Sequence, residues 1–178
     1  MKQLLHQFDH VVSGYIATLP TWLKTPFLLM SFIGQPIVTI SIGLIIAAFA
    51  IFRFNQRLLI ASIVALSTMG INTIIKYTFE RDRPATEYVS HMVIKSYSFP
   101  SGHTAGSTVI FGLLAYLAFQ LLPQPLNVIV SALLALLIIG IGVSRVYLGA
   151  HFPSDVIFGW ILGLVGLSII IYIVAPTI

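Results

Sequence analysis

Two long apolar runs flank a short polar turn in residues 126–175, which read LNVIVSALLALLIIGIGVSRVYLGAHFPSDVIFGWILGLVGLSIIIYIVA. The first run covers Leu126 to Val143 and the second covers Val156 to Ala175. Each is close to the ~20 residues that a helix needs to cross a hydrocarbon core about 30 Å thick. The stretch therefore predicts two membrane-spanning helices, joined at one membrane surface by a turn that carries polar and charged side chains.

The composition of the whole chain agrees with a membrane protein. Of its 178 residues, 58% are hydrophobic and 8% are charged, and the mean hydropathy is +1.02. Soluble domains contain roughly 45–50% apolar and about 25% charged residues, so this composition nearly excludes a soluble protein. The length favours one membrane-embedded domain over residues 1–178. Because the chain has no cysteine, disulfides, thiolate metal sites and cysteine nucleophiles are excluded.

Three further apolar runs have the length and composition of spanning helices. They are Pro36 to Phe52, Leu58 to Ile75 and Thr104 to Leu122. We therefore predict an all-α, polytopic transmembrane bundle of five spans, with its core in residues 36–175. A sixth span is the alternative, in which Pro26 to Ile33 inserts together with the residues before it.

Residues 1–33 are predicted to form short helices outside this core. Apolar residues recur at a spacing of three and four between Leu4 and Ile16, and Pro20 ends the run. This pattern predicts an amphipathic helix that lies along the membrane surface, although a helix packed on the bundle fits equally well. Asp9 lies within the run, which is untypical of a signal peptide, so we expect the N-terminus to be retained.

Three polar clusters fall on the same face of the bundle when the five spans alternate in direction. They are Lys76-Tyr-Thr-Phe-Glu-Arg-Asp-Arg83-Pro84, Pro100-Ser101-Gly102-His103, and Ser144-Arg145 followed by His151 and Asp155. In order and spacing they resemble the type 2 phosphatidic acid phosphatase family, whose signature is K-x6-RP, then PSGH, then SR-x5-H-x3-D. The matching blocks extend from Lys76 to Asp155, and residues 77–103 are the predicted active-site loop.

The cations and the PSGH block are predicted to bind phosphate. Lys76, Arg83 and Arg145 bring three cations to a face where water is scarce, and each is costly there unless it meets an anion. Arginine forks suit phosphate oxygens, and lysine supplies a point charge. Ser101 and Gly102 directly precede an apolar run, so they lie at a helix N-terminus, whose free N–H groups bind anions. The Ser101 hydroxyl can alternatively cap that helix.

His151 and Asp155 lie four residues apart around Pro153, which suits the first turn of a helix. There the carboxylate can accept from one imidazole nitrogen and leave the other free. The family resemblance implies that His151 attacks phosphorus to form a phosphohistidine, that Asp155 orients it, and that His103 protonates the leaving alcohol. It implies no cofactor. A metal site built from these three residues is the competing interpretation, which the adjacent cations oppose.

A phosphate site at the edge of an apolar bundle predicts a substrate whose phosphate lies at headgroup depth. Together with the resemblance, this favours a lipid phosphate phosphatase of a prokaryotic inner membrane, with no nucleic-acid partner. Phosphatidylglycerophosphate, undecaprenyl diphosphate and phosphatidic acid all remain open as substrates. We expect headgroup discrimination in residues 85–99, where the candidates are Glu87, Tyr88, His91 and Lys95. A transporter and a non-catalytic lipid-binding relative are the rival classes.

Residues outside the signature receive structural roles. Arg53 and Arg57 lie in a tight loop at the opposite end of the bundle, which favours a cytoplasmic loop there and an extracytoplasmic active site. Arg81 and Lys95 are expected to extend toward the lipid headgroups. The remaining histidines, His6, His10 and His91, match no motif position and receive no catalytic role. Three glycines in the last span predict close helix packing; they are Gly159, Gly163 and Gly166.

Overall fold

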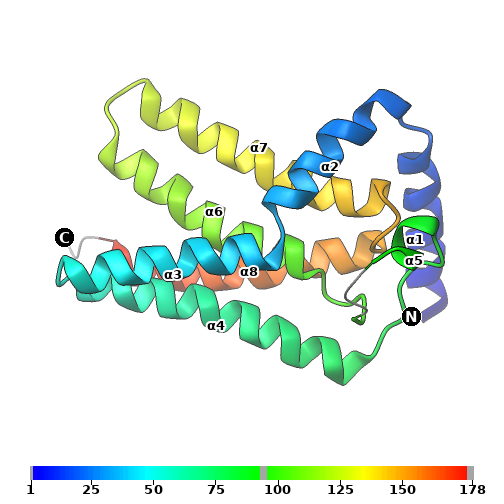
Figure 1. The fold of residues 1–178 in the computed structure, drawn as a ribbon, viewed down its shortest axis with the longest axis horizontal. Helices are drawn as coiled ribbons and strands as arrows, with labels where there is room; N and C mark the ends of the chain where they lie inside the picture. Colours follow the sequence, from blue (N-terminus) through cyan, green and yellow to red (C-terminus); the bar gives the residue numbers. More distant parts are fainter. Residues whose placement is uncertain (1, 93–95, 176–178) are drawn as a thin grey trace.

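The computed structural model describes residues 2–92 and 96–175, and this part of the chain is helical with no strand. The elements in chain order are α1 (Lys2–Ala17), η1 (Thr21–Leu23), α2 (Lys24–Ile33), α3 (Pro36–Phe52), α4 (Gln56–Phe79), α5 (Glu87–Ser90), α6 (Gly102–Leu121), α7 (Leu126–Tyr147) and α8 (Pro153–Val174). The prediction of an all-α polytopic bundle is confirmed (Figure 1).

Four helices of the described part are long and apolar enough to cross a membrane, namely α4, α6, α7 and α8 with 24, 20, 22 and 22 residues. The apolar helix α3 is shorter, at 17 residues, and packs alongside α4 (Figure 1). These five helices coincide with the five predicted apolar runs, and four of them have the length of a span. The segments considered for a sixth span, α1 and α2, meet at a bend of 98°, so they do not form one straight helix.

Helix α6 lies at the centre of the bundle and packs against α3, α4, α7 and α8. The buried core contains Ala61, Ala65, Val109, Ile110, Phe111, Leu113, Ile141 and Ile170. A side chain at Gly159 would meet the Ser101 carbonyl oxygen at 2.8 Å, and one at Gly163 would meet the Ala105 carbonyl oxygen at 2.9 Å. Only glycine therefore lets α8 approach α6 this closely, which agrees with the packing role predicted for these residues.

The helices extend beyond the apolar runs that predict them. Signature residues therefore lie in the terminal turns of these helices. Helix α4 continues past Ile75 to Phe79, and α7 continues past Val143 to Tyr147. Helices α6 and α8 likewise begin before their apolar runs, at Gly102 and Pro153. The first turns of α6 and α8 and the last turns of α4 and α7 thus carry the polar blocks, and these turns meet at one end of the bundle (Figure 1).

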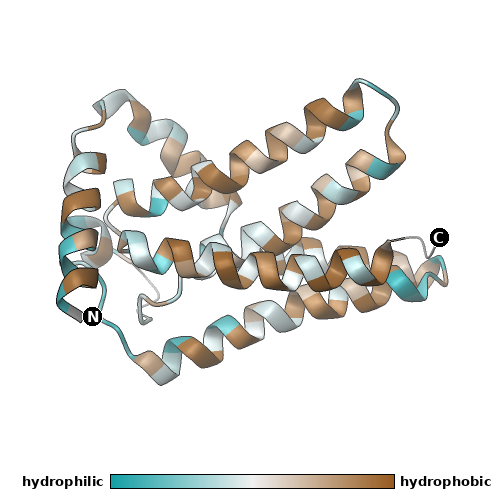
Figure 2. Cartoon of the chain, turned by 180° about the vertical axis from the view of Figure 1, so that it is seen from behind, coloured by the Kyte–Doolittle hydropathy of each residue, from teal (hydrophilic) through white to brown (hydrophobic). Residues whose placement is uncertain are grey.

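Helix α1 lies across that same end of the bundle, roughly perpendicular to the long helices (Figures 1 and 2). It packs against α7 and α8, so the packed alternative of the sequence interpretation is confirmed. Its outer face still exposes large apolar side chains, among them Leu4, Val11 and Tyr15. The charged residue Asp9 on this amphipathic helix does not face solvent, because it is only 2% exposed.

Candidate active site

The turn between α7 and α8 fixes the backbone of His151. Gly149 adopts a positive φ of 68°, and the N–H groups of Ala150 and His151 both donate to the Arg145 carbonyl, at 2.9 and 3.2 Å. The Thr86 hydroxyl donates to the Gly149 carbonyl at 3.0 Å. Glycine is needed at this φ, because other residues are strained there. The turn therefore holds His151 just before the N-terminus of α8, and the His151 side chain is buried.

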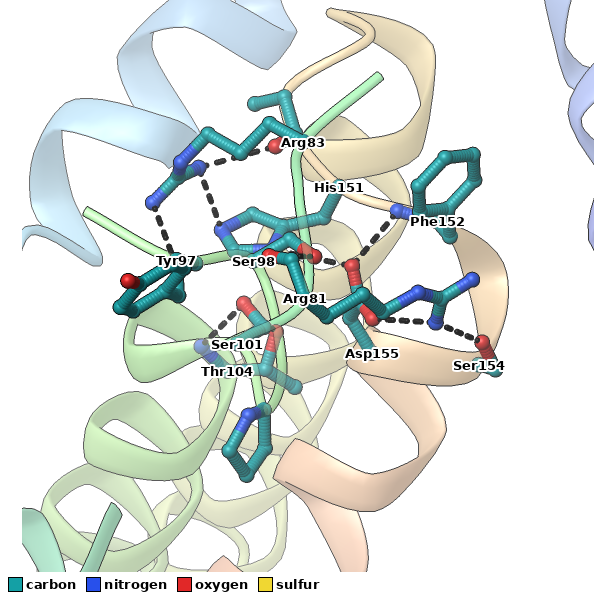
Figure 3. A network of polar contacts seen from close by, with 12 residues as sticks. Arg81, Arg83, Tyr97, Ser98, Ser101, Thr104, His151, Phe152, Ser154 and Asp155 are labelled. Carbon is teal, nitrogen blue, oxygen red and sulfur yellow. Dashed lines mark hydrogen bonds and ion pairs between the residues drawn. The ribbon is translucent and has the colours of Figure 1, made fainter. Parts of the chain in front are cut away.

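The two nitrogens of the His151 ring have different neighbours (Figure 3). Arg83 Nη1 lies 3.1 Å from Nε2, and Asp155 Oδ2 lies 3.5 Å from Nδ1. A guanidinium group can only donate, so Nε2 must be the unprotonated nitrogen and Nδ1 must carry the hydrogen. This assignment directs the free lone pair of His151 toward Arg83.

The surroundings of His151 keep the ring neutral. Burial lowers the pKa of His151 well below its usual value, and the charges of Arg145, Arg83 and Lys76 lower it further. These four effects act against the imidazolium form, because burial removes its hydration and the cations repel it, and they outweigh a backbone hydrogen bond to Ser98 that raises the pKa. The ring is therefore uncharged at neutral pH, which is the state that a nucleophile requires.

The side chain of Arg83 is held by the loop that follows α4 and by the turn after α7. Its Nε donates to the Ser96 carbonyl at 2.7 Å, and its Nη1 donates to the Ala150 carbonyl at 2.9 Å. These two bonds orient the plane of the guanidinium group. Arg83 thus reaches His151 in a fixed position.

Arg145 is the most deeply buried cation among the residues whose burial is described, with 1% of its surface exposed. Its Nη1 donates to the Ser31 hydroxyl on α2 and to the Tyr88 hydroxyl on α5, the latter at 3.3 Å. Its Nε finds no partner among the described residues. A buried guanidinium group with an N–H to spare is suited to an anion. Sequence reasoning missed Ser31, and it considered Tyr88 only for headgroup selection.

Lys76 organises the loop that precedes the PSGH block. Its ammonium group donates to the carbonyls of Tyr97 and Pro100, at 2.6 and 3.0 Å. An ammonium group has three N–H donors, so one remains after these bonds. Its phosphate-binding role stays a prediction.

Ser101 caps α6. Its Oγ accepts from the Thr104 N–H at 3.4 Å and from the Thr104 hydroxyl at 2.9 Å, so the capping interpretation is confirmed. The Ser101 N–H donates to the Asp155 carbonyl at 3.0 Å, which ties the start of α6 to α8. Gly102 follows in the first turn. His103 also lies there, beside the cations Arg145, Arg83 and Lys76 and the imidazole of His151.

Arg81 corrects one sequence-based prediction. We expected this side chain to extend toward the lipid headgroups, but it is only 19% exposed and turns inward. Its Nη1 lies 2.7 Å from Asp155 Oδ1, and its Nη2 lies 2.6 Å from Asp9 Oδ2. Two buried carboxylates attract the guanidinium group more strongly than the membrane surface does. Lys95, which received the same prediction, lies outside the described residues.

A cavity of about 1200 Å³ leads from the surface to His151. It lies between α1, α5 and the turn from α7 to α8, and its lining includes Asp9, His151 and Phe152. The polar side chains around it include His10, Lys24, Glu87, Tyr88 and His91. Within residues 2–92 and 96–175, no group of three or more His, Asp or Glu side chains is arranged to hold a metal ion.

A family model described as the PAP2 superfamily matches residues 57–177, which include all three signature blocks. The chain belongs to the PAP2 superfamily. This PAP2 chain is 36% identical over 99 residues to phosphatidylglycerophosphatase B of Bacillus subtilis, covering 53% of the chain and 46% of that protein. It is 32% identical over 117 residues to the putative undecaprenyl-diphosphatase YbjG of Escherichia coli, covering 63% of the chain and 54% of that protein.

The PAP2 chain therefore spans about half the length of these two curated relatives. Its fold is also similar to a crystal structure described as the first transmembrane PAP2 type phosphatidylglycerolphosphate phosphatase from Bacillus subtilis. The TM-score is 0.78 at 26% identity, and the match covers 94% of this chain and 84% of that one. Because most of both chains is matched, the likeness includes the helices outside the signature.

Proposed function

We propose that this chain is an integral membrane phosphatase that removes phosphate from a lipid phosphomonoester or diphosphate through a phosphohistidine at His151. One observation carries the proposal. The unprotonated Nε2 of a buried, neutral His151 lies 3.1 Å from Arg83. The ring is thus a nucleophile, and the group beside its lone pair is one that binds phosphate.

In the proposed reaction the phosphate displaces the Arg83 contact at Nε2, and the guanidinium group binds a phosphate oxygen instead. The lone pair of Nε2 forms a bond to phosphorus while the bond from phosphorus to the leaving oxygen breaks. The phosphate anion bound beside His103 favours its protonated form, and this imidazolium gives a proton to that oxygen. Water then loses a proton to His103 and attacks phosphorus, and the electrons of the N–P bond return to His151. The sum is hydrolysis, which yields phosphate and the dephosphorylated lipid.

The protein's own charges stabilise the transition state in this scheme. Negative charge builds up on the equatorial oxygens of the transferring phosphoryl group. Lys76, Arg83 and Arg145 supply positive charge there, and the first N–H groups of α6 supply further donors. Asp155 balances the positive charge that His151 gains when Nε2 is phosphorylated. We therefore propose that catalysis needs no metal ion.

We propose that the substrate is a lipid because the site lies at the end of an apolar bundle. The relatives' names refer to phosphatidylglycerophosphate and undecaprenyl diphosphate, and phosphatidic acid is the third candidate. The cavity beside His151 offers room for a headgroup. Glu87, Tyr88 and His91 line it, so we propose that they contact the headgroup.

The test is phosphate release by the purified protein in detergent, with EDTA present. We expect hydrolysis of at least one of the three lipid phosphates and no more than a trace from glucose 6-phosphate, whose phosphate is not held at headgroup depth. The His151→Ala variant serves as the matched control for a contaminating phosphatase. Activity that EDTA abolishes and Mg²⁺ restores would contradict the mechanism.

We further propose an inner-membrane location with the active site on the extracytoplasmic face, because Arg53 and Arg57 occupy the opposite end. The chain has no native cysteine, so single introduced cysteines can be labelled without background. A membrane-impermeant maleimide added to intact cells should label Glu87→Cys at the site and spare Phe54→Cys, although Phe54 is 92% exposed. Labelling of Phe54→Cys alone would place the active site in the cytoplasm.

A further inference from the structure

The buried carboxylate of Asp9 joins α1 to the start of α8. Its Oδ1 accepts from the Ser154 N–H at 2.9 Å, and its Oδ2 accepts from the Ser154 hydroxyl at 2.8 Å. Ser154 lies in the first turn of α8, where backbone N–H groups lack partners within the helix. Asp9, on α1, therefore accepts hydrogen bonds from the first turn of α8. The residue that donates them, Ser154, directly precedes Asp155.

Arg81 connects this carboxylate to Asp155. One terminal nitrogen, Nη2, lies 2.6 Å from Asp9, and the other, Nη1, lies 2.7 Å from Asp155. The guanidinium group also stacks on the Phe152 ring, with 4.3 Å from Cζ to the ring centroid. The planar fork of arginine is held from three sides and bridges two carboxylates, which lysine cannot reproduce. Figure 3 shows Arg81 beside Asp155, on the side of the carboxylate away from Arg83.

Asp155 is the carboxylate that faces His151, and its own position depends on these contacts. Its Oδ1 accepts from Arg81, and its Oδ2 accepts from the Phe152 N–H at 2.9 Å. The distance of 3.5 Å from Oδ2 to His151 Nδ1 is thus set by groups on both sides of the carboxylate. A shift of Asp155 would change the orientation and the basicity of the His151 ring.

We propose that Asp9 is a positioning residue of the active site, which acts through Arg81 on Asp155 and so on His151. This inference rests on the proposed function. It makes α1 part of the site, since the charge of Arg81 is shared between the two carboxylates. Without Asp9 the full charge of Arg81 falls on Asp155, which then stabilises the cationic phosphohistidine less. The other groups that face His151 are the cations Lys76, Arg83 and Arg145 and the titratable imidazole of His103.

The kinetic test compares Asp9→Asn, Asp155→Asn and the double variant in the phosphate-release assay. Asp9 also lines the cavity beside His151, so KM tests whether it contacts the headgroup. If Asp9 acts only by positioning, its loss should lower kcat and leave KM within about twofold. We expect Asp9→Asn to lower kcat roughly tenfold to hundredfold, the range in which small misplacements act. The double variant should be no slower than Asp155→Asn, because Asp9 acts through Asp155.

Two further variants complete the kinetic test. Asp82→Asn is the matched control, because it removes an exposed carboxylate next to Arg81 in the chain, and we expect its kcat to stay unchanged. Arg81→Lys keeps the charge but loses the fork, so it should reproduce the fall in kcat even where Asp9→Asn does not fold. An unchanged kcat in both Asp9→Asn and Arg81→Lys, or losses that multiply in the double variant, would overturn the proposal.

An NMR measurement that does not depend on catalysis separates this inference from the proposed function. In protein labelled with [15N]histidine, we expect Asp9→Asn and Asp155→Asn to shift the Nδ1 resonance of His151, and Asp82→Asn to leave it in place. A His151 resonance that Asp9→Asn does not move would overturn the positioning role. If the wild-type protein releases no phosphate from any lipid of the panel, the proposed function fails, and the His151 resonance still decides the role of Asp9.

Discussion

Replacing His151 with alanine is expected to lower kcat by at least about a thousandfold, a loss of ~4 kcal/mol of transition-state stabilisation. The imidazole of His151 places an unprotonated nitrogen 3.1 Å from Arg83, where the phosphate is proposed to bind. Without it no phosphoenzyme can form, and water must attack the lipid phosphate directly. The measurement is kcat for phosphate release, made beside Tm values of the wild type and the variant.

Asp155→Asn is the comparison variant for this prediction, and we expect its kcat to lie between those of the wild type and His151→Ala. The amide leaves the nucleophile in place but removes the negative charge beside Nδ1, so turnover should be slow but measurable. His151→Ala must therefore be the slower of the two variants. If His151→Ala kept more than roughly a tenth of the wild-type kcat, which corresponds to a loss of only ~1.4 kcal/mol, His151 would not be the nucleophile.

The second large effect is expected from Arg145→Lys. The variant keeps a positive charge but loses the fork that contacts Ser31 and Tyr88 and the Nε–H that has no protein partner. Removing one preorganised donor from a transition-state oxyanion costs about 10²–10³ in rate. We expect kcat/KM to fall by about that factor, measured with the lipid substrate that the wild type prefers.

Arg53→Lys is the matched control for Arg145→Lys. Arg53 is exposed and lies in the turn between α3 and α4, at the opposite end of the bundle. The same chemical change there should leave kcat/KM unaltered. Equal effects of the two substitutions would mean that the loss at Arg145 reflects general destabilisation and not a missing phosphate contact.

The sequence predicted the parts of this fold that depend on local pattern. Apolar runs near 20 residues long indicate spans, and three fixed-spacing blocks indicate which residues meet. The helix ends were less predictable, because they depend on capping and not on hydropathy. Asn55, for example, accepts from the Leu58 N–H at 3.0 Å, so α4 begins before its apolar run. At its other end α4 carries Lys76 beyond the run.

The contacts around the site could not be read from the sequence, because they join residues far apart in the chain. Asp9 and Arg81 are separated by 72 positions, and Ser31 and Arg145 by 114. The one available signal was an acidic residue within the amphipathic pattern of the first helix. Such a residue can lie on the solvent face or be buried against a cation. Only the packing of α1 across the end of the bundle decides between these outcomes.

The most direct test of the central claim is to trap the intermediate. Protein mixed with a ³²P-labelled lipid phosphate is quenched within milliseconds in alkaline detergent, since a phosphohistidine survives base and hydrolyses in acid. We predict label on the protein, bound to the peptide that contains His151 and absent from His151→Ala. Turnover that continues while the wild-type protein carries no label, or label on any other residue, would contradict the account.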